Sequence, residues 1–212
     1  MGSTSTGRGS LGGVVLAGGY STRFGETDKA VADLAGEPMI RRVVDRLATV
    51  ADDVVINCRD EQVDAIRDAL SGCDTAIRYA TDPVPDRGPL AGIRTGLDAV
   101  DREYAAVVAC DMPFVDPDLL ALLADRADGH DGAVVQLEDG WYQTTQAVYR
   151  ASTVADACEA ALDSEDTRIL AALDHVDVVT VPEDDLDEID PATFESIDTR
   201  EALADAERQF EA

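Results

Sequence analysis

The sequence has very little positive charge, and almost none of it is lysine. Of 212 residues, 17 are Lys or Arg and 44 are Asp or Glu, which gives a formal net charge of −27, and Lys29 is the single lysine. A negative charge of this size repels nucleic acid and anionic membrane, so we expect neither as a partner. The acidic residues are spread along the chain, which favours a solvated halophilic surface over an acidic recognition patch. A cation retained in this background is therefore a candidate functional residue.

Cysteine pairs, histidine and long apolar runs are also scarce. The four cysteines form no C-x-x-C pair and the two histidines are isolated, which argues against a zinc site or a disulfide framework. No apolar run approaches the roughly 18 residues of a membrane span. Residues 1–10 (MGSTSTGRGS) lack the apolar stretch of a signal peptide and predict a flexible tail. These absences predict a soluble, cytoplasmic protein.

The remaining residues, 11–212, predict one α/β domain. Apolar residues make up 45% of the chain, and single domains commonly contain about 100–200 residues. Short apolar runs predict buried strands, and apolar residues at helical spacing predict helices. We expect strands at 13–17, 53–57, 76–80, 104–110, 133–137, 142–149 and 176–181, and helices at 39–50, 62–70, 90–100, 117–127, 153–162 and 200–210. This alternation predicts a mostly parallel sheet with ligands at the carboxyl ends of its strands.

The segment LAGGYSTRFGETDKA at residues 16–30 predicts a phosphate-binding loop. A buried strand runs into Gly18 and Gly19, and the loop that follows carries Arg23 and Lys29. Glycine lets backbone N–H groups approach anionic oxygens closely, and the two side chains add positive charge. The spacing fits neither the dinucleotide fingerprint G-x-G-x-x-G nor the Walker pattern G-x-x-x-x-G-K-[ST]. An ordinary strand-to-helix turn is the alternative.

The segment VVACDMPF at residues 107–114 places Asp111 at the end of a central strand. One carboxylate at that edge suits Mg²⁺, which takes one or two protein carboxylates together with substrate phosphates and water. The alternative is an aspartate that caps a helix, a role that suits Asp116 or Asp118. With a phosphate loop on a neighbouring strand, we favour the metal ligand.

Smaller signals lie at the same predicted edge. Asn57 closes the second strand, Asp82 follows the third, and RGPLAG at residues 87–92 forms a tight loop into a helix. Each of these features alone is more often turn chemistry than a ligand contact. Together at one edge, they predict a nucleoside pocket.

These motifs resemble the molybdenum cofactor guanylyltransferase family (MobA-type). The resemblance rests on L-A-G-G-x-S-x-R-x-G-x-x-D-K from residue 16, C-D-M-P from residue 110, G-P-L-A-G at 88–92 and F-x-x-I-D-T-x-x-x-L at 194–203. It covers nearly the whole chain from Gly12. It implies a three-layer α/β/α Rossmann-like nucleotidyltransferase fold. It also implies transfer of GMP from GTP to molybdenum-molybdopterin, with release of pyrophosphate.

The resemblance assigns roles to individual residues. It implies Mg²⁺ as the cofactor, bound by Asp111. The positive charge of the phosphate loop adds Arg23 to Lys29 and Asp111 as the predicted catalytic residues. Its implied substrates are GTP and the molybdopterin cofactor, and molybdenum cofactor biosynthesis proteins or acceptor molybdoenzymes are further candidate partners. The GTP-binding residues that the resemblance implies are Leu16, Ala17, Gly18, Lys29, Asn57, Asp82 and Asp111. The backbone amide of Gly19, next to Gly18 in the glycine turn, is a further predicted GTP contact.

The chain departs from the family pattern in its C-terminal half. Thr144 stands where relatives often have Pro, and Ser196, Asp198 and Arg200 stand in place of an N-x-N-T-P motif. The resemblance places both segments in the half that holds the pterin. Asp198 has two open roles, a second Mg²⁺ contact or a cap on the terminal helix. Its position directly before Thr199 favours the cap.

Three other functions stay open. A transferase that uses CTP, or that acts on another phosphorylated acceptor, would carry similar motifs. A catalytically silent protein that binds the cofactor is the second, and the presence of Lys29 and Asp111 argues against it. A dinucleotide-dependent oxidoreductase is the third, and the missing G-x-G-x-x-G fingerprint argues against it.

Overall fold

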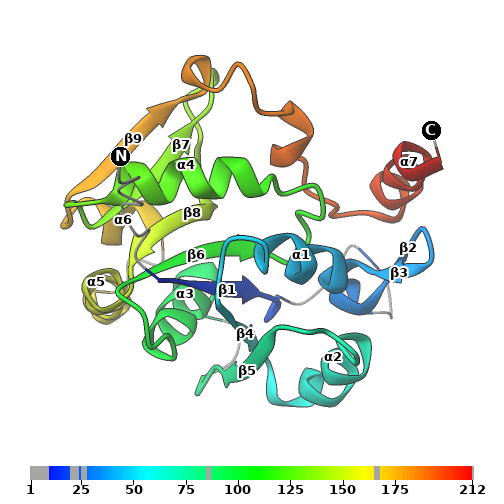
Figure 1. The fold of residues 1–212 in the computed structure, drawn as a ribbon. Coiled ribbons are helices and arrows are strands. Elements are labelled where there is room, and N and C mark those ends of the chain that lie inside the picture. Colours follow the sequence, from blue (N-terminus) through cyan, green and yellow to red (C-terminus); the bar gives the residue numbers. More distant parts are fainter. Residues whose placement is uncertain (1–9, 20–23, 25–27, 85–86, 165–167, 212) are drawn as a thin grey trace, which may run out of the picture.

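A computed structural model describes residues 10–19, 24, 28–84, 87–164 and 168–211. A central sheet is covered by helices on both faces (Figure 1). Apart from Ser10, the predicted N-terminal tail lies outside the described residues. Within these ranges every helix is too short or too polar to cross a membrane.

The sheet of the described residues has seven strands in the order β5-β4-β1-β6-β8-β7-β9. β8 runs antiparallel to its neighbours β6 and β7, and the other neighbouring pairs are parallel. The carboxyl ends of six strands and the start of β8 therefore share one edge. The strands are β1 (Leu11–Leu16), β4 (Asp53–Cys58), β5 (Ala76–Thr81), β6 (Tyr104–Ala109), β7 (Gly132–Gln136), β8 (Tyr142–Arg150) and β9 (Val178–Pro182).

The seven predicted strands and six predicted helices are all present, with bounds that differ by at most three residues. The largest difference is at the first helix, which ends at Leu47 because residues 48–51 form turns. A short hairpin, β2 (Asp33–Leu34) with β3 (Glu37–Pro38), was not predicted. The helices are α1 (Met39–Leu47), α2 (Val63–Ala69), α3 (Pro89–Asp98), α4 (Pro117–Ala127), α5 (Ala151–Asp163), the unpredicted α6 (Ile169–Leu173) and α7 (Arg200–Glu211). Two-residue strands and a five-residue helix are too short for hydrophobic periodicity to reveal.

The core is divided by the sheet because successive strand residues face opposite sides. Val15 and Val108 face α1, α2 and α4, whereas Val14 and Val107 face α3 and α5, and all four are fully buried. A third, smaller cluster packs α7 against the hairpin and against Phe24. The C-terminal helix thereby lies beside the β2–β3 hairpin (Figure 1).

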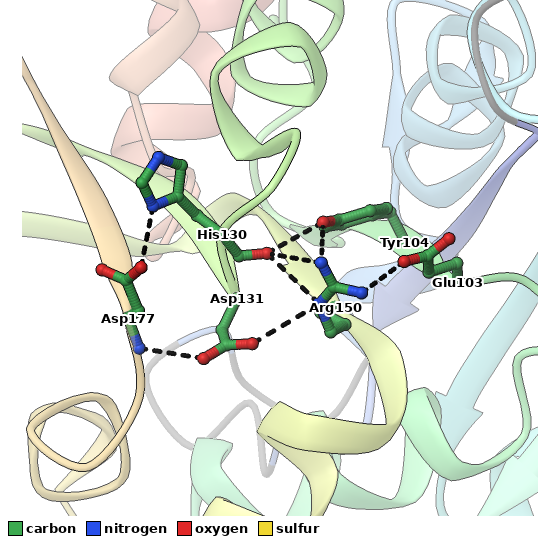
Figure 2. A network of polar contacts seen from close by, with 6 residues as sticks. All are labelled: Glu103, Tyr104, His130, Asp131, Arg150 and Asp177. Carbon is green, nitrogen blue, oxygen red and sulfur yellow. Dashed lines mark hydrogen bonds and ion pairs between the residues drawn. The ribbon is translucent and has the colours of Figure 1, made fainter.

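The edge opposite the carboxyl ends is held by a polar network around Arg150 (Figure 2). The Arg150 guanidinium lies 4.8 Å from the centre of the Tyr104 ring and donates to the carbonyl oxygen of His130 at 3.2 Å. It also pairs with Glu103 and Asp131. These contacts tie the start of β6 to the end of β8 and to the turn before β7. The network therefore stabilises the sheet at the far end from the predicted ligand edge.

Gly96 sets the distance between α3 and β1. A Cβ atom on Gly96 would lie 2.4 Å from Cγ1 of the buried Val14. Glycine normally weakens a helix, so its presence here reflects the close approach of the helix to the strand.

We expect Gly96→Ala to lower the free energy of unfolding by about 1–3 kcal/mol, because the added methyl group overpacks the core. Urea denaturation at constant salt measures this change. Thr95→Ala, one residue earlier on α3, is the control and should change stability by less than about 0.5 kcal/mol. A Gly96→Ala protein as stable as the parent would contradict the overpacking argument.

Candidate active site

A cleft of about 470 Å³ lies at the carboxyl ends of the central strands. All eight predicted GTP-binding residues line it, although they come from four separate parts of the sequence. The predicted catalytic residue Arg23 lies outside the described residues. The lining consists of Leu16, Ala17, Gly18, Gly19, Lys29, Asn57, Asp82, Arg87, Gly88, Pro89, Gly92, Ala109, Cys110, Asp111, Met112, Gln143, Thr145, Phe194 and Ser196.

Lys29 lies between two carboxylates. Its Nζ atom is 2.5 Å from Oδ2 of Asp111 and 2.8 Å from Oδ1 of Asp198, and the Lys29 and Asp111 side chains are each 16% exposed. Burial by itself lowers the pKa of Lys29, but the charge of Asp111 and the hydrogen bonds to Asp111 and Asp198 outweigh it and hold the pKa well above its usual value. Lys29 is therefore a permanent cation that joins the N-terminal loop to the end of β6.

The turn that carries Lys29 is fixed by its own aspartate. Residues Lys29–Val31 form a single 3₁₀ turn, and the side chain of Asp28 accepts a hydrogen bond from the N–H group of Ala30 at 3.0 Å. This capping role of Asp28 was not predicted from the sequence. Its place directly before a short turn is typical of an N-cap.

The expectation that Asp198 caps the terminal helix is wrong. Thr199 does so: its Oγ1 atom accepts from the N–H group of Ala202 at 3.1 Å, while the Asp198 carboxylate turns to Lys29. Asp and Thr are both common N-cap residues, so the sequence does not distinguish them. In the structure, the Asp198 carboxylate forms an ion pair with the partly buried Lys29 and is not available to the helix. The other predicted cap is confirmed at the start of α4, where the side chain of Asp116 accepts a hydrogen bond from the N–H group of Asp118 at 2.8 Å.

The C-terminal segment contacts Phe24, in the loop after β1, and Asp111 at the end of β6. The Arg200 guanidinium donates to the carbonyl oxygen of Phe24 at 3.0 Å, and the N–H group of Ile197 donates to the carbonyl oxygen of Asp111 at 2.8 Å. Two of the departures from the family pattern, Asp198 and Arg200, thus pair with the loop that carries Lys29. From the sequence, this segment was expected in the half that holds the pterin, with a second Mg²⁺ contact at Asp198 as one open role.

Asn57 and Asp82, which the sequence predicted at the same sheet edge, are hydrogen-bonded to each other. Asn57 is 2% exposed, and its Nδ2 atom donates to Oδ1 of Asp82 at 2.9 Å. A Cβ atom on Gly92 would lie 2.6 Å from Oδ1 of Asn57, and one on Gly18 would lie 3.2 Å from Oδ2 of Asp82. The two glycines therefore leave room for polar oxygen atoms at the base of the cleft.

Some cleft residues were not predicted from the sequence. Gln143 and Thr145 reach the cleft from the start of β8, since this antiparallel strand begins where its neighbours end. Arg59 and Gln62 do not line the cleft, but they hold the glycine turn from behind. The sequence feature that could have indicated Arg59 and Gln62 is their position directly after β4, at the ligand edge of the sheet.

A metal ion at this site would depend on substrate oxygens. In the described part of the chain, His, Cys, Asp and Glu side chains form no group of three or more that could hold a metal by themselves. Asp111 offers one carboxylate at the cleft, and Asp198 offers a second one on the other side of Lys29. This donor set suits a hard divalent cation that also binds phosphate.

Comparison with known proteins decides the family. The family model described as a MobA-like NTP transferase domain matches residues 13–184. The chain belongs to this family. The MobA-like family includes nucleotidyltransferases, so the predicted enzyme class is confirmed.

Individual relatives agree with this assignment to the MobA-like family. A probable molybdenum cofactor guanylyltransferase of Natronomonas pharaonis is 47% identical over 93% of this chain and 97% of the relative. One of Methanosarcina mazei is 34% identical over 90% of this chain and 87% of the relative. The crystal structure of molybdopterin-guanine dinucleotide biosynthesis protein A from Archaeoglobus fulgidus, 27% identical, superposes with a TM-score of 0.77 over 95% of this chain and 99% of that chain. The predicted fold class is confirmed.

We expect Thr199→Ala to lower the free energy of unfolding by about 0.5–2 kcal/mol, because α7 loses its cap. Asp198→Asn removes the ion pair with Lys29 and should leave the helicity of α7 unchanged. Urea denaturation and far-ultraviolet circular dichroism measure the two effects. A greater loss of helix in Asp198→Asn than in Thr199→Ala would show that Asp198 is the cap after all.

The lone lysine allows a direct chemical measurement of the Lys29–Asp111 pair. Asp111→Asn removes the main negative charge that favours protonated Lys29, so the pKa of Lys29 should fall and more free amine should be present. An amine-acylating reagent at a fixed, mildly alkaline pH should then modify Lys29 faster than in the parent protein. Peptide mass spectrometry reports this rate, with the amino terminus as the internal reference. Equal rates at Lys29 would contradict the pairing.

Proposed function

We propose that this protein transfers GMP from GTP to molybdenum-molybdopterin, forming molybdopterin guanine dinucleotide and releasing pyrophosphate. One observation carries the proposal: a single cleft brings together a glycine turn, a partly buried Lys29–Asp111 pair and the Asn57–Asp82 pair. The glycine turn would bind phosphate, the Lys29–Asp111 pair would lie beside a phosphate-bound cation, and the Asn57–Asp82 pair would bind the nucleoside. The names of the relatives supply the base and the acceptor.

The nucleotide would lie across the ends of β1, β4 and β6. The amides of Gly18 and Gly19 and the ammonium of Lys29 would bind the phosphates, with Arg23 adding charge from the same loop. Asn57 and Asp82 would accept hydrogen bonds from the nucleoside. Leu16 and Ala17 would line the floor between the two parts.

Mg²⁺ is the cofactor that we propose for this site, with Asp111 as its protein ligand. The carboxylate is partly buried, it lies at the ligand edge, and it already pairs with a cation. When bound, the ion would neutralise phosphate oxygens and polarise the α-phosphate. Lys29, held by Asp111 and Asp198, would stay beside the same oxygens as a second positive charge.

The chain's own residues would catalyse the transfer by positioning and by charge neutralisation. The acceptor phosphate would attack the α-phosphorus in line as pyrophosphate leaves, with no covalent enzyme intermediate. The thiol of Cys110, next to Asp111, is fully buried, and burial raises its pKa strongly, so it stays protonated and is a poor nucleophile. The glycine amides, Arg23 and Lys29 would hold the leaving pyrophosphate.

The acceptor would enter from the β8 side of the cleft. Gln143 and Thr145 line this side, together with Phe194 and Ser196. We propose that the reaction takes place in a salt-rich cytoplasm, which the net charge of −27 supports. Handover of the product to other cofactor biosynthesis proteins or to molybdoenzymes remains a prediction.

The test is a matrix of nucleotides and acceptors. Pyrophosphate release should require GTP, Mg²⁺ and molybdenum-molybdopterin together, and it should be much slower with CTP. Faster turnover with CTP, or with another phosphorylated acceptor, would assign the protein to a different member of the nucleotidyltransferases. Tight GTP binding without turnover would indicate a silent cofactor-binding protein.

Within this assay, Asp111→Asn should lower kcat by roughly 100-fold or more, since a metal-centred charge contributes several kcal/mol to barrier lowering. Asp116→Asn is the matched control, because it removes one nearby carboxylate but keeps a residue that can cap α4. It should leave kcat within about twofold of the parent protein. Near-normal kcat for Asp111→Asn at saturating Mg²⁺ would rule out the assigned role.

A further inference from the structure

Two side chains from the segment after β4 bind the backbone of the glycine turn. Nη1 of Arg59 donates to the carbonyl oxygens of Gly18 at 2.8 Å and Gly19 at 2.9 Å. Nε2 of Gln62 donates to the carbonyl oxygen of Ala17 at 3.0 Å. Three successive carbonyl groups of the turn are therefore held by only two side chains.

Both side chains are anchored before they reach the turn. The Arg59 side chain is 11% exposed, and its Nε atom pairs with Glu61 at 2.7 Å. Gln62 is 3% exposed, and its Oε1 atom accepts from the N–H group of Arg59 at 2.8 Å. Little side-chain entropy remains to be lost when they bind the carbonyls, so the contacts act as a rigid clamp.

The direction of the carbonyls fixes the direction of the amides. The described peptide bonds are all trans, and in a trans peptide the C=O and N–H groups point to opposite sides. The turn from Ala17 to Gly19 lines the cleft, whereas Arg59 and Gln62 do not. With the carbonyls of Ala17 and Gly18 turned away from the cleft, the N–H groups of Gly18 and Gly19 point toward it.

The same clamp reaches the turn that carries Lys29. Nε2 of Gln62 also donates to Oδ2 of Asp28, and Nη2 of Arg59 lies 4.0 Å from that oxygen. The other oxygen of Asp28 caps the Lys29–Val31 turn. One hydrogen-bond network thus fixes both the amides and the ammonium that face the cleft.

We propose that Arg59 and Gln62 are positioning residues that preorganise the glycine turn for phosphate by holding its carbonyl oxygens away from the cleft. This inference rests on the proposed function, because it assumes that nucleotide phosphates bind at the turn. A glycine pair is free to flip its peptide planes, and a flipped plane would present a carbonyl oxygen to an anion. The hydrogen bonds from Arg59 to the carbonyl oxygens of Gly18 and Gly19 restrain that flip. In a chain of net charge −27, the guanidinium also offsets nearby negative charge.

The test compares nucleotide binding by the full chain and its variants. Isothermal titration calorimetry with Mg²⁺–GTP and with Mg²⁺–pyrophosphate should show affinities roughly 10- to 100-fold weaker for Arg59→Ala, as expected for two lost charge-assisted hydrogen bonds. Gln62→Met keeps the volume but removes the donor, and it should also weaken both ligands. Arg67→Ala removes the same charge from α2, where Arg67 pairs with the exposed Asp64, and should leave both affinities unchanged.

Two further measurements separate positioning from general loss of structure. Millimolar guanidinium should restore part of the affinity of Arg59→Ala, and it should not improve Arg67→Ala or the parent protein. Arg59→Lys should fall between the parent and Arg59→Ala, because an ammonium lacks the guanidinium fork. If Arg59→Ala does not fold, Arg59→Lys and Gln62→Met carry the comparison.

The possible failures are distinguishable. If the parent protein binds neither GTP nor pyrophosphate, the proposed function fails. If the parent binds both and folded Arg59→Ala or Gln62→Met binds them equally well, the positioning role is overturned. An affinity loss that guanidinium does not reverse, together with a lower melting temperature, would show that Arg59 serves stability alone.

Discussion

The parallel register of β1 with β4 and β6 is the constraint on which the cleft depends. Leu16 lies opposite Asn57 on one side and Ala109 on the other, so the segments that follow these strands leave the sheet at the same level. The glycine turn, the Asn57–Asp82 pair and Asp111 meet for this reason. Gly96 contributes indirectly, because the close packing of α3 on β1 also keeps Gly92, near the start of the same helix, beside Asn57.

The positively charged side chains make different contacts at the surface and around the cleft. In most of the chain, arginines form ion pairs at the surface, which contribute little to stability. At and around the cleft, Lys29 binds the carboxylates of Asp111 and Asp198, and Arg59 and Arg200 bind backbone carbonyls. Each of these contacts joins two segments that are distant in sequence. The positive charge thus serves the assembly of the cleft.

The C-terminal segment changes how the departures from the family pattern are understood. Asp198 and Arg200 bind Lys29 and the carbonyl oxygen of Phe24, and α7 packs on the same region through Phe114 and Phe210. The C-terminal segment, which the sequence placed in the acceptor half, therefore also holds Phe24 and Lys29 in the segment after β1. Because Lys29 pairs with both Asp111 and Asp198, the end of β6 and the C-terminal segment are joined at one ammonium group.

The sequence by itself determined the succession of the seven main strands and of six helices, the sheet edge that holds the cleft and eight of the residues that line it. These features depend on local periodicity and on motif residues at strand ends, such as Gly18 and Asp111, which are visible without any partner. Only the tertiary structure decided between Asp198 and Thr199 as the cap, and only it brought Arg59 and Gln62 behind the glycine turn. Those outcomes depend on contacts between segments far apart in the chain, whose distances and competing partners are set only when the sheet has formed.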